Sequence, residues 1–319
     1  MNRMYKEKRN RLIGIFILLC MGLAGCSEYE RQSEEIQRNP VPLMVVSATV
    51  VDEPGRGNGS DRTRVAVPVS LKNGDRIGVF LTATSGNYMN TCYTRNSGIW
   101  RPKTPEDRSS LLGAGKVCAY YPWGAAAVTT DFSLIPQLYT VENDICFATN
   151  QDIDDSKGQV SVAFEMKHAY AMLELDVVRS TTQDDALLTA LKLENSALPA
   201  HRLLDITTGS YGTLTTAGEL AFQEVNITLS KNNTIPLKIL LPPSDLLNGS
   251  GLKVTFILYG KILSFTVPTN GVMKKLEAGK RYKVTVNTNG TYYVVGEVTL
   301  AEWSLQDMDN GGTGYVPLS

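Results

Sequence analysis

The chain has 319 residues, of which 43% are apolar, with 31 basic residues against 32 acidic ones. Five of the basic residues and one of the acidic residues lie within residues 1–25, so the remainder carries 26 basic and 31 acidic residues, a net charge of about −5. The apolar share is ordinary for a globular protein. The lack of a basic excess argues against binding to nucleic acid, which relies on clustered Lys and Arg.

The first 25 residues are typical of an export signal. Five basic residues precede an apolar stretch at 12–23, which is too short to cross ~30 Å of hydrocarbon as a helix and fits the core of a signal peptide. The following Leu23-Ala24-Gly25-Cys26 resembles a bacterial lipobox. That resemblance implies cleavage before Cys26 and lipidation of its sulfur with palmitate-type chains, which would anchor the protein in the outer membrane. A plain signal peptide with a chance cysteine is the alternative.

The rest of the chain is too long for a single core, so two domains are expected. Residues 26–40 are polar and lack apolar periodicity, which predicts a flexible tether. A polar stretch at 179–183 is the natural joint. We therefore expect an N-terminal domain over residues 41–179 and a C-terminal domain over residues 180–319.

The N-terminal half shows the period and composition of β-strands. Residues 43–51 are rich in β-branched side chains and lie between Pro42 and Pro54, which predicts a first strand. We expect Leu43, Val45 and the residues at alternating places after them to pack into the core of the first domain. Residues 65–71 alternate apolar and small or polar residues, and Pro68 marks an edge strand because it has no N–H to donate. A turn at 73–75 leads to a strand at 77–82, and further strands are predicted at 116–121, 160–164 and 171–178. Residues 83–115 are polar and turn-rich, and predict a long excursion with Trp100 as its apolar anchor.

The C-terminal half continues in the same way. Strands are predicted at 225–229, 235–241, 252–259, 262–267, 281–286 and 292–300. Gly260-Lys261 is a two-residue hairpin connection, and residues 287–290 join the next pair with an Asn-Gly signal. A helical pattern occurs at 184–193, with Leu187, Leu188 and Leu191 on one face. Many short strands separated by turns predict an all-β protein built from β-sandwiches.

Of the five cysteines, Cys20 would leave with residues 1–25, and three remain besides Cys26: Cys92, Cys118 and Cys146. An odd number excludes full internal pairing. Cys118 and Cys146 lie in apolar sequence, where a thiol behaves as a small hydrophobe, so we expect buried thiols, with one disulfide as the alternative. The absence of a CxxC pair argues against zinc and thioredoxin-type chemistry.

Residues for catalysis or metal binding are sparse. The chain has two histidines, His168 and His201, and no GxSxG elbow, so His168 is interpreted as structural. The glycines at 55, 57 and 59 lack the Gly-Lys-Ser/Thr ending of a phosphate loop. Residues 150–155 place carboxylates at alternating positions but depart from the EF-hand pattern, so a solvated turn is favoured over a calcium site; the acidic run at 307–311 is equally weak. We expect no enzyme activity, no metal and no cofactor.

Several short motifs, taken in order, resemble the fimbrillin family of Bacteroidetes, the lipoprotein precursors of type V pili. They are Thr63-Arg64, NGDRIGVF at 73–80, AYYPW at 119–123, HAYAMLEL at 168–175, LEAGKRYKV at 276–284 and Trp303. The resemblance implies two transthyretin-like β-sandwich domains, export as a lipoprotein and assembly into fimbriae at the cell surface. The implied partners are other fimbrial subunits and a surface receptor on a host or bacterial cell.

The family resemblance also implies assembly by β-strand addition. An arginine-specific protease would remove the first strand, residues 43–51, and a neighbouring subunit's strand would fill the groove. Arg64 fits the family's cleavage position best, because Thr63-Arg64 directly precedes the next strand, and Arg62 and Arg56 are the other candidates; these arginines could instead decorate a loop in a subunit that keeps its first strand. The short, glycine-broken tail after Trp303 favours a tip or accessory subunit.

A surface glycan-binding lipoprotein is the alternative function. Tyr88, Tyr93 and Trp100 would suit sugar stacking if they are exposed. A groove beneath residues 43–51 would suit polymerisation instead.

Overall fold

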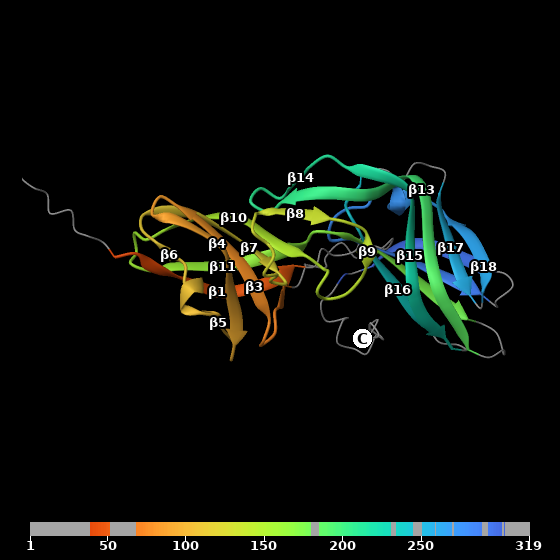
Figure 1. The fold of residues 1–319 in the computed structure, drawn as a ribbon, viewed down its shortest axis with the longest axis horizontal. Coiled ribbons are helices and arrows are strands. Elements are labelled where there is room, and N and C mark those ends of the chain that lie inside the picture. Colours follow the sequence, from red (N-terminus) through yellow and green to blue (C-terminus); the bar gives the residue numbers. More distant parts are fainter. Residues whose placement is uncertain are drawn as a thin grey trace, which may run out of the picture. The chain divides into compact units, whose positions relative to one another are not determined.

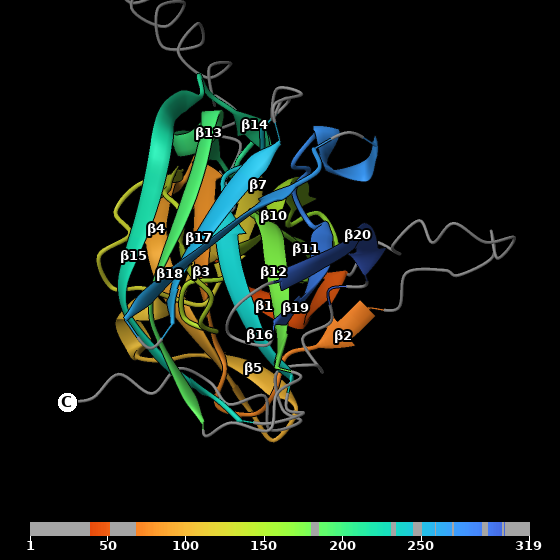
Figure 2. The ribbon, with the colours of Figure 1, turned by 90° about the vertical axis from the view of Figure 1, so that its right-hand side faces the viewer.

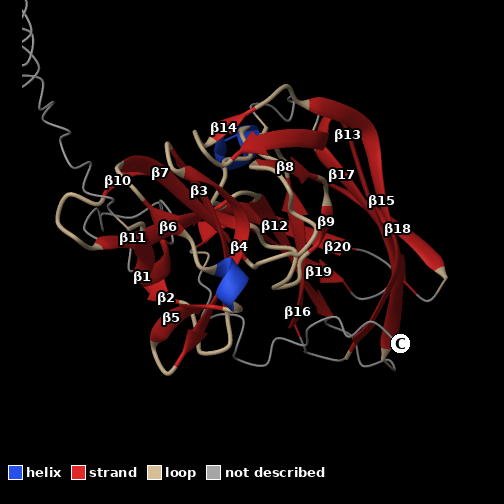
Figure 3. Cartoon of the chain, turned by 60° about the vertical axis from the view of Figure 1, so that its left-hand side comes forward, coloured by secondary structure: helices blue, strands red, loops and turns tan. Residues whose placement is uncertain are grey.

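The computed structural model describes residues 39–51, 68–179, 185–230, 234–244, 251–258, 260–269, 271–288, 293–301 and 303. These residues are almost entirely β-strand (Figure 3), with short 3₁₀ helices at Pro105–Asp107 and Gly271–Lys274. The all-β prediction is confirmed. Within these ranges, no helix has the length and apolar character needed to cross a membrane. Cys26, Arg56, Arg62, Arg64, the tether and the tail after Trp303 lie outside the described residues.

Nine strands from the N-terminal half form one sheet in the order β2-β1-β11-β10-β7-β3-β4-β5, with β6 paired to β1 (Figure 1). Their bounds are β1 Val41–Val51, β2 Pro68–Ser70, β3 Arg76–Ala83, β4 Gly86–Asn96, β5 Ile99–Pro102, β6 Ser110–Leu111, β7 Ala114–Tyr121, β10 Cys146–Asp154 and β11 Val160–His168. The register between β10 and β11 is confined to two neighbouring residue pairs, Cys146↔His168 and Phe147↔Lys167. The sheet divides at this corner into a small layer of β11, β1, β2 and β6 and a large layer of β10, β7, β3, β4 and β5.

The side chains between these two layers form the first core. Strand β11 alternates strictly, with Val160, Val162, Phe164 and Met166 buried. Strand β3 is buried on both faces, because Val79 and Leu81 belong to this core while Phe80 belongs to another cluster. Two-sided burial explains why the β3 sequence is apolar without alternation.

The remaining strands form two further sheets (Figure 2). One has the order β20-β19-β12-β16-β9, and the other has β14-β13-β17-β18, with β15 and β8 also paired to β13. Side chains of both sheets share a second core, which is the arrangement of a β-sandwich. The bounds are β8 Asp131–Leu134, β9 Gln137–Leu138, β12 Ala171–Arg179, β13 Ala186–Asp205, β14 Ser210–Tyr211, β15 Thr215–Leu229, β16 Thr234–Leu241, β17 Leu252–Leu258, β18 Lys261–Val267, β19 Arg281–Thr288 and β20 Tyr293–Ala301.

A third cluster of buried side chains draws on both halves of the sequence. Phe80, Tyr120 and Phe147 of the large layer pack there with Leu204, Leu240 and Trp303. Trp303, the last described residue, is buried. The motif at 168–171 contributes Ala169 and Tyr170, and the carbonyl oxygen of Ala169 accepts a hydrogen bond from the Tyr211 hydroxyl at 3.0 Å.

Several local predictions are wrong. Residues 186–193 of the predicted helical stretch lie in β13, where β15 and β17 pair on either side and override the helix propensity of its Leu and Ala residues. The predicted excursion at 83–115 contains β4, β5 and β6, although its anchor Trp100 is buried as expected. The carboxylates of 150–154 lie in β10 rather than in a turn.

The division into domains at residue 179 stays a prediction. The sheet pairing groups β12, which ends at Arg179, with the C-terminal strands β16 and β19. The short strands β8 and β9 also pair with C-terminal partners, β13 and β16. A division made by sheets would therefore fall between β11 and β12.

Candidate functional site

Strand β1 inserts one row of apolar side chains into the first core. Leu43 and Val45 are buried, as predicted, while Met44 and Val46 are 56% and 63% exposed. The predicted alternation fails beyond Val45, because a register shift between Val45 and Ser47 moves Ala48 and Val50 to the buried face. A bulge of this kind adds one residue to a strand and so reverses the side on which later residues lie.

One wall of the β1 site is its parallel neighbour β11 (Figure 1). The register places buried residues of the two strands beside one another: Leu43↔Val160, Val45↔Val162, Ala48↔Phe164 and Val50↔Met166. Removal of β1 would therefore expose both a backbone edge and a row of apolar side chains on β11. Such an unpaired edge is a template for another strand.

On its other side, β1 is held near its ends. Val41 and Pro42 pair with β6, and residues 49–51 pair with β2. Leu43 N–H also donates to the carbonyl oxygen of Ser109 at 2.9 Å. In the described part of the chain, the register gives residues 44–47 no ladder partner on this side. Strand β2 is the last strand of the sheet order, which is where Pro68 was predicted to lie.

Aromatic side chains from the large layer contribute to the same core. Tyr93 and Trp100 are buried, and the Tyr93 hydroxyl donates to the carbonyl oxygen of Leu43 at 3.5 Å. Burial raises the pKa of Tyr93. Tyr88 is half-buried, and its hydroxyl lies 2.8 Å from Ser110 Oγ. The expectation that these aromatics are exposed for sugar stacking is wrong for Tyr93 and Trp100, which removes the main support for the glycan-binding alternative.

The energetic weight of β1 is large for one strand. Burial of Leu43, Val45 and Val50 contributes about 1.5–3 kcal/mol per side chain. Their sum, on the order of 5–9 kcal/mol, is comparable to the whole net stability of a domain, about 5–15 kcal/mol. The β1 site therefore combines side chains that the core requires with a backbone segment, residues 44–47, whose ladder partner among the described residues is β11 alone.

The cysteines are confirmed as buried thiols. Cys92, Cys118 and Cys146 are buried and form no disulfide within the described residues. Burial raises the pKa of Cys92, and it raises that of Cys118 to about 12. Since the thiolate is the reactive form, Cys92 and Cys118 are poor nucleophiles.

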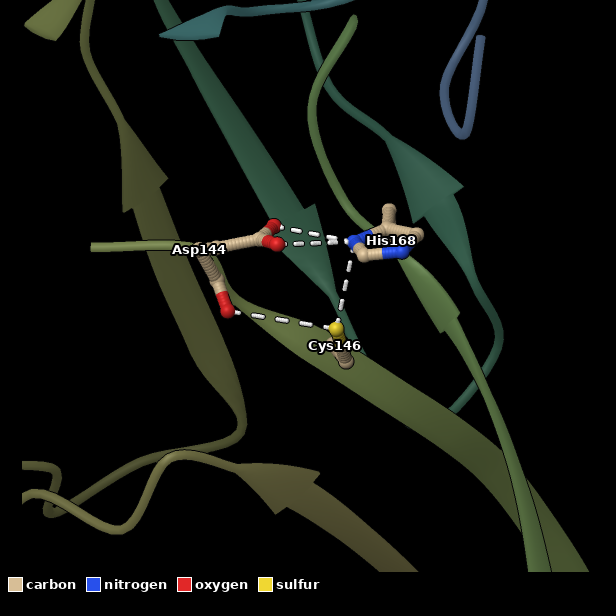
Figure 4. A group of neighbouring side chains, drawn as sticks. All are labelled: Asp144, Cys146 and His168. Carbon is tan, nitrogen blue, oxygen red and sulfur yellow. Dashed lines mark hydrogen bonds and ion pairs between the residues drawn. The ribbon is translucent and has the colours of Figure 1, made fainter. Parts of the chain in front are cut away.

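One cluster of titratable side chains was missed by the sequence analysis. Cys146 Sγ lies 3.3 Å from His168 Nδ1, and Asp144 Oδ1 lies 3.0 Å from the same nitrogen (Figure 4). A catalytic relay places the carboxylate on one ring nitrogen and the nucleophile on the other. Both groups meet Nδ1 here, so this is not the geometry of a Cys-His-Asp relay. In the sequence, Cys146 and His168 lie at the ends of two apolar segments. Their proximity could be recognised only once the pairing of these two strands is known.

Comparison with solved structures places the fold among candidate cell adhesion proteins of Bacteroides. A protein from Bacteroides ovatus is 16% identical at a TM-score of 0.58, covering 84% of this chain and 99% of its own. One from Bacteroides uniformis is 17% identical at 0.56, covering 83% and 98%, and one from Bacteroides fragilis is 10% identical at 0.54, covering 83% and 98%. These likenesses show the fold alone.

Comparison with curated proteins finds no match. The family model described as fimbrillin-like matches residues 63–303. This range spans β2 to the buried Trp303 and includes strands of all three sheets, while β1 lies before it. The chain belongs to the fimbrillin-like family.

Proposed function

We propose that this chain is a non-enzymatic structural subunit or adhesin of a cell-surface fimbria, joined to neighbouring subunits by strand exchange at β1. The observation that carries the proposal is the combination found in β1: four core side chains and a backbone segment at 44–47 for which the described strands on the side of β2 and β6 provide no ladder partner. Membership of the fimbrillin-like family supports the same role. Main-chain pairing supplies affinity in strand addition, and pockets for alternate side chains supply specificity.

Strand removal would begin with cleavage in the connection between β1 and β2. Arg64 is the proposed site, with Arg62 and Arg56 as the other candidates. The freed strand would leave β11 unpaired beside an open apolar groove. A strand from another subunit would restore both the backbone hydrogen bonds and the buried apolar surface.

Delivery to the surface is proposed to follow the lipoprotein route. Residues 1–25 would be removed as a signal, Cys26 would be lipidated, and residues 26–40 would tether the folded part to the outer membrane. Cys26→Ala should abolish incorporation of labelled palmitate, because the acceptor sulfur is gone. Incorporation equal to that of the unchanged chain would contradict the lipoprotein assignment.

The position in the fibre is proposed to be the tip or an accessory site, with a surface receptor on a host or bacterial cell as a further partner. Two sandwich domains of the transthyretin type remain the proposed organisation.

An arginine-specific protease tests the strand-exchange proposal. Cleavage of the full chain should release residues 43–51 and produce either oligomers or a monomer with a lower Tm. The matched control carries Arg56→Lys, Arg62→Lys and Arg64→Lys, which keep the charge and resist the protease. The control should remain monomeric with an unchanged Tm. A stable monomer that has lost the strand and keeps its original Tm would refute strand exchange.

A further inference from the structure

The corner that joins the two layers of the first sheet brings together three metal-ligating side chains. Cys146 is the first residue of β10 and His168 is the last of β11, and the antiparallel register pairs them directly. Asp144 lies two residues before Cys146, in the segment that leads into β10. All three residues are buried, and their ligand atoms lie within 4.8 Å of one another.

The separations of the ligand atoms are close to those around a zinc ion. A tetrahedral ion with Zn–S of about 2.3 Å and Zn–N of about 2.0–2.1 Å holds these two ligands roughly 3.5 Å apart. Cys146 Sγ and His168 Nδ1 are 3.3 Å apart, and each carboxylate oxygen of Asp144 lies 3.0 Å from Nδ1. Figure 4 shows the three side chains directed toward one another from separate backbone positions. All three ligand atoms lie within 4.8 Å of one another, so an adjustment of about 1 Å would admit the ion.

One nitrogen in this cluster, His168 Nδ1, is shared by more groups than a single hydrogen bond can serve. A neutral imidazole nitrogen either donates one hydrogen bond or accepts one, yet Nδ1 faces a thiol and both oxygens of a carboxylate. Among the described residues, no donor bonds Asp144 Oδ2, although this atom is buried. Leaving a buried carboxylate oxygen without a donor is costly.

The charges of the three groups suit a divalent cation. A thiolate and a carboxylate supply two negative charges and the imidazole is neutral, so a bound dication makes the buried site neutral overall. Cys, His and Asp are all established ligand types for Zn²⁺, and the second carboxylate oxygen supplies a fourth position. Trp303 stacks on the His168 ring with centroids 4.1 Å apart and an interplanar angle of 16°, which holds the imidazole plane in place.

We propose that Asp144, Cys146 and His168 form a structural zinc site. The Cys146 thiolate, His168 Nδ1 and one carboxylate oxygen of Asp144 bind one Zn²⁺, and the second carboxylate oxygen, whose short bite does not span a tetrahedral angle, makes a longer fourth contact. The thiol proton is released to solvent when the ion binds, since the thiolate is the ligand form. The ion fixes the corner where β10 and β11 separate, and through the His168–Trp303 stack it also fixes the end of the described chain.

The test uses the purified full chain, unfolded in the presence of a chelator and refolded with or without Zn²⁺. One equivalent of zinc per chain should remain after gel filtration, and Tm should rise. Refolding with Co²⁺ should give a thiolate-to-cobalt charge-transfer band in the near ultraviolet. Cys146→Ser should weaken Zn²⁺ binding by more than about 100-fold, because changes to residues that merely orient a ligand already cost 10–100-fold.

Cys118→Ser is the matched control, because Cys118 is an equally buried thiol in the third cluster. It should retain the zinc and the cobalt band. Asp144→Asn provides a second ligand variant and should also weaken binding. The proposal is overturned if the unchanged chain refolds without retaining zinc and gives no cobalt–thiolate band, or if Cys118→Ser loses the metal as fully as Cys146→Ser.

Discussion

Strands β1 and β12 are both long apolar strands with a parallel partner, but they are held very differently. β12 pairs from Met172 to Val178 with β19 on one side and with β16 on the other, without a register shift. β1 pairs along most of its length with β11 across a bulge, and its other side is partnered near its ends. Strand β1 has no charged residue, whereas β12 carries buried carboxylates.

The buried carboxylates tie β12 to its neighbour. Arg281 of β19 donates to Glu174 from Nε at 2.7 Å and from Nη2 at 2.8 Å. Lys283 lies 3.4 Å from Glu174 and 2.6 Å from Asp176. Replacing β12 would require any incoming strand to reproduce these charges, whereas replacing β1 requires only apolar side chains at the right positions. Because its buried face carries no charge, β1 is the better candidate for the strand exchange proposed above, and β12 is a poor one.

The largest effect is expected in β12. Arg281→Ala should lower the free energy of unfolding by about 3–5 kcal/mol, because the buried Glu174 carboxylate loses two short charge-assisted hydrogen bonds and keeps the longer pair with Lys283; Glu174 is 1% exposed and Arg281 is 13% exposed. Urea unfolding measures the change. Lys116→Ala, which removes an exposed pair with Asp152, is the control and should leave the midpoint unchanged. Equal midpoints for Arg281→Ala and the unchanged chain would contradict the claim that buried ion pairs hold β12 to β19.

The next effect is expected in β1. Leu43→Ala should cost about 2–3 kcal/mol through lost burial and a residual cavity. Met44→Ala, one residue along and exposed, should stay within about 0.5 kcal/mol. Thermal unfolding of both variants measures the contrast. Similar losses at the two positions would mean that β1 does not pack as described.

A smaller effect tests the other face of the large layer, where Tyr120 belongs to the third cluster. Gly78→Ala in β3 should cost about 1–3 kcal/mol, because the added methyl group would collide with the Tyr120 ring. Gly218→Ala in β15 meets no atom within 4 Å and should be neutral or slightly stabilising. Urea midpoints compare the two variants. If Gly78→Ala leaves the urea midpoint unchanged, the large layer would accommodate an added methyl group more readily than β1 accommodates the loss of the Leu43 side chain.

The smallest effect is a pH dependence specific to β12. Burial acts to raise the pKa of Glu174, but hydrogen bonds and positive charge from Arg281, with Lys238 and Lys283, outweigh it and lower the pKa. A lowered pKa contributes stability above the unfolded value of about 4.3, and this stability is lost as pH falls through the folded pKa. Asp176 acts in the opposite sense, since burial and the nearby Glu174 raise its pKa.

Glu174→Gln should therefore lose less stability than the unchanged chain between pH 7 and about pH 3. Urea midpoints at the two pH values measure the difference. Asp152→Asn, at an exposed carboxylate, should keep the original dependence. If Glu174→Gln loses as much stability on acidification as the unchanged chain, the lowered pKa assigned to Glu174 would be contradicted.

Much of the fold was accessible from the sequence wherever one face of a strand is buried. The alternation of β11, the turn at Gly74 and the hairpin at Gly260, with φ of 94° and 69°, follow from local rules. The prediction at 184–193 was wrong because the neighbours β15 and β17, remote in sequence, determine its conformation. Leu187, predicted to share a face with Leu188, is exposed while Leu188 is buried, as alternation in a strand requires.

The site was partly predictable. Residues 43–51 were identified as the first strand, and Leu43 and Val45 as core residues, but the bulge before Ser47 has no local sequence signal. The burial of Tyr93 and Trp100 depends on the curvature that brings β5 against β1. The cluster of Asp144, Cys146 and His168 depends on a register between positions 22 residues apart, which periodicity alone does not fix.

The parallel pairing of β1 has a consequence for the order in which the chain becomes structured. Thr49 and its neighbour Phe164 are 115 residues apart. At about 5–20 residues per second, the ribosome needs roughly 6–23 s after completing β1 to produce its partner. During that interval β1, which is uncharged and rich in β-branched residues, has no parallel partner, because β11 has not yet been synthesised. Among the described pairings, that of β1 with β11 spans the widest separation in sequence. The earliest strand to be synthesised is therefore the one with the longest exposure to pairing with another chain.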